Sequence, residues 1–343
     1  MRRTSTRRSL ISKRHDHKQI ELKMPLSIEK MVAQMHALRA RIEGGVVAQA
    51  SVELAAIFAK AEIALARRQE LFNSLLTYPD GKLQNIPENI DAANLIIKEL
   101  HEDIGKFIVG PGKEWADDII PTMHKAGRDL ARLNLDVAFL SPEQIKSAFD
   151  LVLPAEKGVL KTGYQDTYRI MGVVGDDVES WFRRTMMDSV IEEIPLVNKL
   201  NPSADTLMSR LIESGRIKPI KIKTNSGKFI TRSVRQRAEA IARIESGKII
   251  NRTHEALAAD VLGDDAVYRN SNPHDSRTTP ICRHASQAGL KTLAQWSASR
   301  FGRPPRLNPF HLCRSVLIGG MAEWFEDIPE KQFVDLPKQT NAP

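Results

Sequence analysis

The stretch Asn272-Pro-His-Asp-Ser-Arg-Thr-Thr-Pro-Ile-Cys282, followed later by Pro304-Pro-Arg-Leu-Asn-Pro-Phe-His-Leu-Cys-Arg-Ser315, decides how the C-terminal part of this chain is interpreted. It contains both cysteines of the 343-residue sequence, and each cysteine has a histidine two residues away. Short apolar runs at Ala266-Val-Tyr-Arg269 and Val316-Leu-Ile318 flank it and predict two strands. A small α+β domain is therefore expected here.

The spacing of the pairs Cys282/His284 and His311/Cys313 predicts a metal site. In an extended strand or tight turn, side chains at i and i+2 lie on the same face. Thiolates and imidazoles are ligands that zinc prefers, and four of them close a structural tetrahedral site. Two alternatives stay open: buried cysteines that act as small hydrophobic groups, and a disulfide, which a reducing compartment disfavours.

The polar residues around Asp275 also suggest a clamp that needs no metal. An aspartate at the start of a turn bonds the backbone two residues further on, which suits the run from Asp275 to Thr278. Its carboxylate can also accept two hydrogen bonds from one arginine, either Arg277 or Arg314. Such a clamp would hold two loops together.

A catalytic interpretation of the same region is the third alternative. General acid–base chemistry on a phosphodiester would use His274, His311 and Glu245. Charge stabilisation would come from Arg243, Arg277 or Arg314. The spacing does not require this chemistry, and the sequence contains no phosphate-binding glycine-rich loop, nucleophile elbow or metalloprotease helix.

Residues 27–215 are predicted to form a mainly α-helical region. Apolar residues recur at helical spacing from Leu54 to Leu75 and from Ile90 to Phe107. Gly110-Pro111-Gly112 is expected to break the second helix, while Ser141-Pro142 and Asn201-Pro202 mark two later helix starts. The stripes indicate the core of a helix bundle, which could also present a docking surface to another protein.

Residues 216–320 are predicted to form the α+β domain, and residues 321–343 a tail. A hairpin is expected around the turn Asn225-Ser-Gly227. A basic amphipathic helix from Arg232 to about Glu245 follows, and then a second helical stretch that ends near Gly263. The fold class expected for the chain is thus a mainly α N-terminal region with a small α+β C-terminal domain.

The N-terminal residues 1–26 are predicted to be a disordered basic arm. The formal net charge of the chain is +8, and eight basic residues stand against two acidic ones in residues 1–24. Such an arm can contact nucleic-acid phosphates, here through Arg2, Arg3, Arg7 and Arg8. No apolar run approaches the roughly 20 residues of a membrane span, and two cysteines suit a reducing compartment, so a cytoplasmic protein is expected.

Several motifs occur in an order that resembles a known family. They are Ala242-Arg-Ile-Glu-Ser-Gly-Lys-Ile-Ile-Asn251, Asp275-Ser-Arg-Thr-Thr-Pro-Ile-Cys282, Gly289, Pro304-Pro305 and His311-Leu-Cys-Arg314. Over residues 230–320 this order resembles the C-terminal domain of the phage head morphogenesis family, the minor head proteins of the phage Mu F type. Relatives often have cysteine where this chain has Thr279 and Ser315.

The resemblance implies a structural protein of a tailed phage or prophage. Such a minor head protein is made in the host cytoplasm, enters the procapsid near the portal in few copies, and stays in the virion head. Its helical region would bind the portal, scaffold or major capsid protein, and it could accompany DNA in packaging or ejection. The family motif residues would then be structural: Arg243, Glu245, Asp275, Arg277, Thr278 and Arg314. Similar domains fused to toxin modules imply the alternative, a toxin-like ribonuclease.

Overall fold

The computed structural model divides into two compact units. It describes residues 28–73, 75–78, 83–136, 142–192, 220–223, 229–232, 234–273, 275, 278–304 and 313–325. Unit 1 comprises Met1–Val47, Ile120–Gly163 and Arg243–Pro343, and unit 2 comprises Ala48–Ile119 and Tyr164–Ala242. The division does not coincide with the expected boundary after residue 215, because three long helices each contribute residues to both units.

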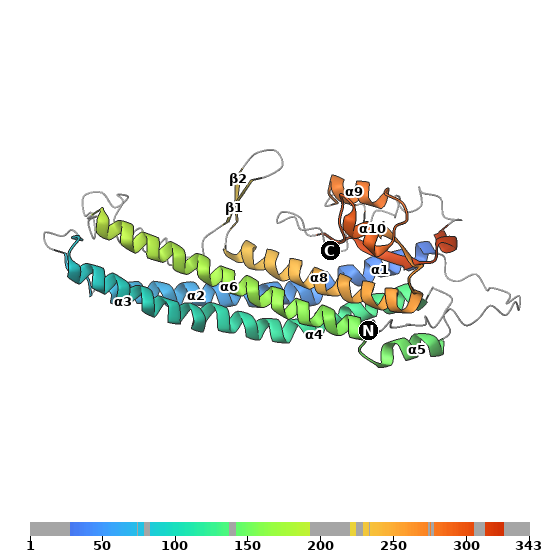
Figure 1. Cartoon of the computed structure of the whole chain (residues 1–343), viewed down its shortest axis with the longest axis horizontal. Helices are drawn as coiled ribbons and strands as arrows, with labels where there is room; N and C mark the ends of the chain where they lie inside the picture. The colour runs from blue at the N-terminus through green and yellow to red at the C-terminus, as the bar shows by residue number, and fades with distance from the viewer. Residues whose placement is uncertain are drawn as a thin grey trace, which may run out of the picture. The chain divides into compact units, whose positions relative to one another are not determined.

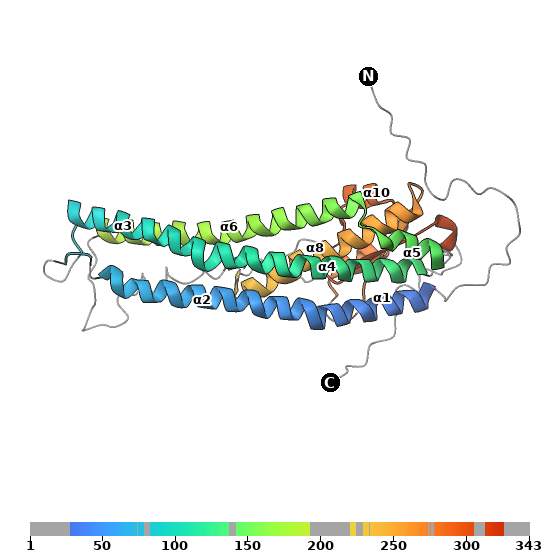
Figure 2. The same cartoon turned by 90° about the horizontal axis from the view of Figure 1, so that it is seen from below.

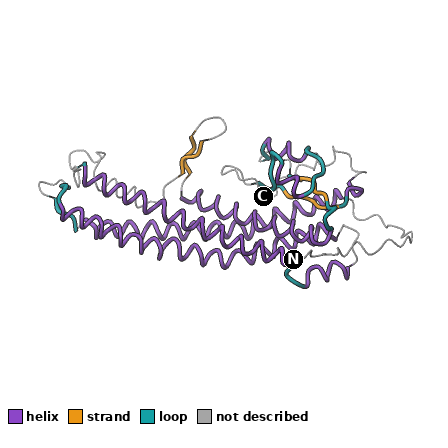
Figure 3. The backbone as a smooth tube through the Cα atoms, viewed as in Figure 1, coloured by secondary structure: helices purple, strands orange, loops and turns teal. Residues whose placement is uncertain are grey.

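Helices dominate the described residues (Figures 1 and 3). They are α1 (Ile28–Ile42), α2 (Ala48–Asn73), α3 (Pro87–Ile104), α4 (Gly110–Asp136), α5 (Pro142–Asp150), α6 (Pro154–Ile191), α8 (Val234–Leu262), α9 (Pro280–Ser286) and α10 (Leu293–Ala298). The strands are β1 (Ile220–Lys223), β2 (Phe229–Arg232), β3 (Val267–Ser271) and β4 (Val316–Gly320). The expected fold class, a mainly α region followed by a small α+β part, is confirmed.

Unit 2 is built on α2, α3, the first part of α4 and the later part of α6 (Figure 2). Its apolar residues recur every three or four positions, so each helix buries one face. On α2 the buried face carries Leu54, Phe58, Ala61 and Leu65, as the periodicity predicted. Trp115 on α4 donates its indole N–H to the carbonyl oxygen of Ala50 at 3.1 Å, which ties α4 to the start of α2.

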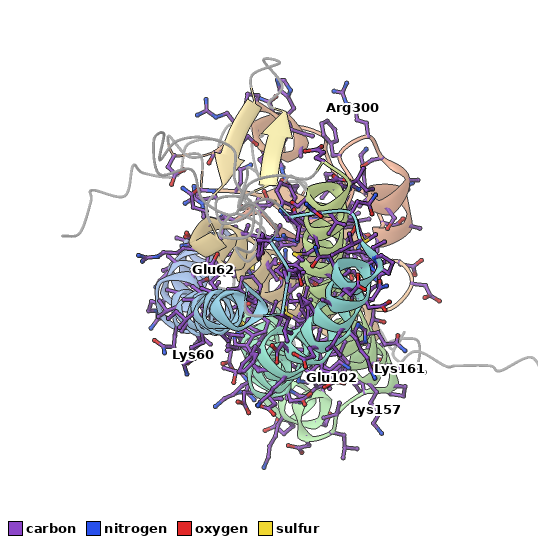
Figure 4. All side chains as sticks on the ribbon, turned by 90° about the vertical axis from the view of Figure 1, so that its left-hand side faces the viewer. Lys60, Glu62, Glu102, Lys157, Lys161 and Arg300 are labelled. Carbon is purple, nitrogen blue, oxygen red and sulfur yellow. The ribbon has the colours of Figure 1, made fainter. Side chains whose placement is uncertain are left out.

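Charged side chains cover the solvent faces of the helices. Lys60 on α2 and Glu102 on α3 are exposed, and Figure 4 shows them projecting outward. Lys157 on α6 is exposed in the same way in unit 1. This division of apolar and charged faces is the amphipathic pattern of ordinary bundle helices.

The expected helix break at Gly110-Pro111-Gly112 is wrong. A π-helical turn, η3 (Gly105–Val109), joins α3 to α4 instead, and the N–H of Gly110 bonds to the carbonyl oxygen of Gly105. The wider turn lets the chain stay helical through Pro111, whose ring would otherwise displace the preceding turn. A second π turn, η1 (Glu43–Val47), joins α1 to α2 in the same way.

The hairpin predicted after residue 216 is present as β1 and β2. The two strands are antiparallel, with Ile220 opposite Arg232 and Lys223 opposite Phe229. The two helical stretches expected after it form one continuous helix, α8, which Gly263 ends with a φ of 82°. The helix start predicted at Asn201-Pro202 lies outside the described residues.

Unit 1 contains the two strands predicted on either side of the cysteine region. β3 and β4 pair antiparallel, with Val267 opposite Gly320 and Ser271 opposite Val316. α9 and α10 lie in the connection between these strands, and Figure 1 shows them beside the strands at the C-terminal end of α8. The apolar core of this region consists of Leu135, Ala258, Leu262, Ala266, Tyr268, Ala285, Trp296 and Leu317.

One helical stretch, Lys30–Ala66, is long and apolar enough to cross a membrane by length and composition alone. This differs from the expectation that no run approaches such a length. Core helices of other proteins pass the same criterion, and Leu54, Phe58 and Ala61 in this stretch are fully buried inside unit 2.

Gly127 on α4 allows close contact with α8 inside unit 1. A Cβ at this position would lie 2.6 Å from the carbonyl oxygen of Ile250, a backbone atom that cannot rotate away. Gly127→Ala is therefore expected to lower the free energy of unfolding by about 1–3 kcal/mol, measured by urea denaturation. Gly158→Ala in the same unit is the control, because nothing lies within 4 Å of its added Cβ.

Alanine favours a helix over glycine by roughly 1 kcal/mol, so Gly158→Ala should be neutral or stabilising. Equal urea midpoints for the two variants would show that α4 and α8 are not in backbone contact at Gly127.

Candidate functional site

An ion pair between Asp275 and Arg314 joins the segment before α9 to the segment before β4. Arg314 donates Nη1–H to Oδ2 of Asp275 at 2.7 Å and a second, shorter bond from Nη2–H to Oδ1. This bidentate arrangement is the stronger of the common carboxylate–guanidinium geometries. Arg314 is one of the two partners that the sequence suggested for Asp275; the other, Arg277, lies outside the described residues.

Asp275 also organises its own turn. Thr278 donates its backbone N–H to the Asp275 carbonyl oxygen at 3.0 Å and its hydroxyl to Oδ1 at 3.2 Å. Arg283 on α9 donates to the same carbonyl oxygen at 3.3 Å. Asp275 therefore fixes two places at once. Its carbonyl and carboxylate oxygens hold the turn before α9, and its carboxylate also holds Arg314, the residue after Cys313. We call Asp275, Thr278 and Arg314 the polar clamp.

The two cysteines are brought together beside this clamp. Cys282 Sγ and Cys313 Sγ lie 3.9 Å apart although the residues are 31 positions apart in the chain. Both side chains are buried, and no disulfide joins them. Asn272, at the end of β3, donates its amide N–H to the carbonyl oxygen of Cys282 at 2.8 Å and holds α9 against the strand.

The expectation that Cys282 and His284 share one face is wrong. Thr279 and Pro280 begin the short helix α9, so both residues are helical rather than extended. Side chains two positions apart on a helix point about 200° from one another. Cys282 is accordingly buried while His284 is exposed to solvent.

A four-ligand zinc site that includes His284 therefore does not fit this geometry. The described residues contain no group of three or more histidine, cysteine or acidic side chains able to hold a metal ion. His311, the fourth predicted ligand, lies outside the described residues, as does His274. Two adjacent thiols are what the described part of the site offers to a soft metal.

The helix motif around Arg243 and Glu245 occupies α8. Glu245 is 3% exposed and its Oε1 accepts a hydrogen bond from Lys248 at 2.8 Å. Asn251, in the same motif, donates to the carbonyl oxygen of Ser315 at 3.3 Å. Since Ser315 follows Arg314 directly, the motif helix and the clamp contact the same short segment before β4.

A buried polar cluster that the sequence did not reveal lies next to Asn251 in unit 1. Arg39 on α1 donates to Oδ1 of Asn251 at 3.3 Å and to Glu43 at 3.1 Å. His36, one turn earlier on α1, lies with its Nε2 2.8 Å from the hydroxyl of Ser271 on β3. The contacts with Asn251 and Ser271 join residues more than 200 positions apart, and spacing in the sequence carries no signal for them.

His254 on α8 belongs to this buried region and is completely enclosed. Neither of its ring nitrogens has a hydrogen-bond partner among the described residues. Burial, and to a smaller extent the positive charge of Arg39, lowers the pKa of His254 to about 4. The imidazole is therefore neutral in the folded protein near neutral pH.

This burial predicts an acid-labile unit 1. Between pH 4 and 6.5 the unfolded chain binds a proton at His254 that the folded chain does not, so stability rises with pH across that window. The unfolding free energy should be about 3 kcal/mol lower at pH 4 than at pH 7 on account of this residue. His254→Leu, which cannot bind a proton, should remove that part of the pH dependence in urea titrations. Identical pH profiles for the two proteins would contradict the prediction.

The predicted phosphate-contacting residues Arg2, Arg3, Arg7 and Arg8 lie outside the described residues. No family model, no curated protein and no solved structure matches the chain. The polar clamp, the adjacent thiols and the buried motif helix are therefore what a function has to be argued from. In the clamp and on the motif helix, the charged groups named above are paired with one another: Asp275 with Arg314, and Glu245 with Lys248.

Proposed function

We propose that this chain is a minor head protein of a tailed phage, incorporated into the procapsid near the portal. The observation that carries the proposal is the convergence of the motifs that resemble the phage head morphogenesis family. Asp275 pairs with Arg314, Cys282 lies beside Cys313, and Asn251 bonds to Ser315. Residues scattered over the motif region are joined by direct contacts, as expected if they maintain one small domain.

The proposal assigns a structural role to the motif residues. Glu245 is buried and bonded to Lys248, and Asp275 is held by Arg314 and Thr278. A general acid or base must reach the proton that it transfers on a substrate. An enclosed carboxylate that is bonded to a neighbouring lysine suits a structural role better than the alternative, a toxin-like ribonuclease.

The proposed partner is the portal, the scaffold or the major capsid protein. Unit 2 presents long helices with charged outer faces, which suits docking to a protein surface rather than chemistry.

Gly289, part of the motif region, has a φ of 72°, a conformation that glycine adopts without strain. A structural zinc ion remains a proposal as well, limited to the two thiols and to ligands outside the described residues.

Disrupting the gene in the phage or prophage that carries it tests the role in assembly. An early stop codon should abolish infectious particles, and the wild-type chain supplied in trans should restore them. Supplying the Glu245→Gln variant in trans distinguishes a structural role from ribonuclease activity. The substitution keeps the size of the buried side chain and removes its charge. Host killing on overexpression that Glu245→Gln abolishes would favour the ribonuclease and overturn the structural proposal.

The basic arm is proposed to contact packaged DNA inside the virion head. Deleting residues 1–24 removes eight basic residues, so DNA affinity should fall and its dependence on salt should become shallower. Fluorescence anisotropy with a labelled duplex at several salt concentrations measures both quantities. The matched control replaces only Arg2, Arg3, Arg7 and Arg8 by glutamine. An unchanged salt slope in both variants would exclude the arm as the DNA contact.

A further inference from the structure

The buried thiols of Cys282 and Cys313 in unit 1 lie close together, and no disulfide joins them in the structure. Cys282 Sγ and Cys313 Sγ are 3.9 Å apart, and the side chains are 1% and 6% exposed. A disulfide needs its sulfurs about 2 Å apart, so the remaining approach is also about 2 Å. Side-chain rotation and local backbone adjustment together have to supply that approach.

We propose that Cys282 and Cys313 form an intramolecular disulfide when the chain meets an oxidising medium. The two residues are the only cysteines of the sequence, so each has one partner within the chain. The proposal goes beyond a role in phage heads and does not depend on it. It would make the region around the polar clamp a reversible redox-sensitive lock.

The reaction needs an oxidant, for which a low-molecular-weight disulfide such as oxidised glutathione suffices. The thiolate of one cysteine attacks a glutathione sulfur, forms a mixed disulfide and releases one glutathione thiolate. The second cysteine thiolate then attacks the protein sulfur of this mixed disulfide and releases the other glutathione. Two protein thiols are oxidised, one glutathione disulfide is reduced to two thiols, and two protons are transferred.

The covalent link would join the same two chain segments as the ion pair. Asp275 and Cys282 lie on the segment that leads into and through α9, and Cys313 and Arg314 are adjacent before β4. In the reduced protein the bidentate ion pair and the buried sulfur contact hold these segments. In the oxidised protein the disulfide would hold them even when the ion pair is broken.

The contact between the Cys282 and Cys313 sulfurs favours disulfide formation over metal binding. A disulfide needs the two cysteines alone, whereas a closed zinc site needs two more ligands. His284, the nearest predicted third ligand in the sequence, is exposed on the other side of α9. Among the described residues no histidine, cysteine or acidic side chain completes a group of three with these thiols, whereas the disulfide needs no further residue.

Refolding the full chain under defined redox conditions tests the proposal. The chain is reduced, unfolded in urea with EDTA, and refolded in oxidised glutathione or in excess reduced glutathione; unfolding first exposes the buried thiols. The oxidised product should lack the mass of two hydrogens, accept no iodoacetamide after denaturation and remain monomeric. For residues 31 positions apart, the melting temperature should rise by about 10 °C.

Two sets of variants make the result specific. Cys282→Ala and Cys313→Ala should each retain one alkylatable thiol or one glutathione adduct, with no rise in melting temperature. Arg314→Ala should melt below the wild type when reduced, and the gap should narrow in the oxidised forms because the disulfide holds the same segments.

Three outcomes would overturn the proposal. The first is a refolded, oxidised chain that still carries two alkylatable thiols or two glutathione adducts. The second is disulfide-linked dimers as the main product, which would mean that the two sulfurs do not meet within one chain. The third is stoichiometric zinc in protein purified without chelator, together with thiols that resist oxidation until the zinc is removed.

Discussion

Replacing Trp296 by alanine is expected to lower the free energy of unfolding of unit 1 by about 3–5 kcal/mol. The side chain is completely buried on α10 and packs in the core with Tyr268, Leu262 and Leu317. Alanine would leave a cavity the size of an indole in a region that α8 and β3 cannot easily fill. Hydrogen exchange at the β3 and β4 amides, or urea unfolding, measures the loss.

Trp296→Phe is the matched control, because it keeps most of the volume and removes the indole N–H. That N–H donates to the carbonyl oxygen of Tyr268 at 2.8 Å, and the same oxygen also accepts from the backbone of Lys291 at 3.1 Å. The oxygen therefore keeps one partner, and the loss should be about 1–2 kcal/mol. If Trp296→Ala unfolds within 1 kcal/mol of the wild type, Trp296 is not part of the core.

Replacing Glu156 by alanine should have a comparable effect, about 3–5 kcal/mol, because it leaves the partly buried guanidinium of Arg128 without its carboxylate partner. Glu156 is fully buried near the start of α6. Its Oε1 lies 2.8 Å from Nη1 of Arg128 and 3.0 Å from Nε2 of His124, and its Oε2 accepts the N–H of Leu153 at 2.8 Å. One carboxylate thus joins α4 to the start of α6 within unit 1.

The pH dependence of this site has a definite direction. Burial alone would raise the pKa of Glu156, but the contacts with His124, the Leu153 N–H and Arg128 outweigh it and lower the pKa. The stabilisation is therefore present above the pKa of an ordinary glutamate and is lost as the pH falls through the lowered value. Urea titrations of Glu156→Gln should lack this acid-induced loss, and the exposed neighbour Lys157→Ala should behave as wild type. A Glu156→Ala variant as stable as Lys157→Ala would contradict the account of the site.

The spacing of apolar residues predicted the helical part of the chain well. Apolar residues that recur with the helical period of 3.6 residues lie on one face of a helix, and that face is buried. Leu54, Phe58, Ala61 and Leu65 are all in the core of unit 2. The end of α8 at Gly263 and the two strands around the cysteines were also readable from local residues. The helix break at Gly110-Pro111 failed because a π turn can absorb a proline, a backbone adjustment that has no local signature.

The candidate site was predictable only where its contacts are local or chemically specific. Asp275 with Arg314 could be proposed because carboxylates and guanidinium groups pair. The prediction that Cys282 and His284 share one face was wrong because it depends on an extended strand or tight turn, whereas Thr279-Pro280 begins a helix. Contacts of Arg39 with Asn251 and of His36 with Ser271 cross over 200 residues and depend on how the helices pack.

The most direct measurement of the central proposal is the amount of this chain in purified procapsids. The full chain is co-expressed with major capsid, scaffold and portal proteins from the genome that carries it. The particles are separated by sedimentation and quantified by mass spectrometry. A few copies per procapsid are expected when the portal is present, and far fewer when it is omitted. Absence of the chain from portal-containing procapsids, with all of it sedimenting as soluble protein, would contradict the proposed function.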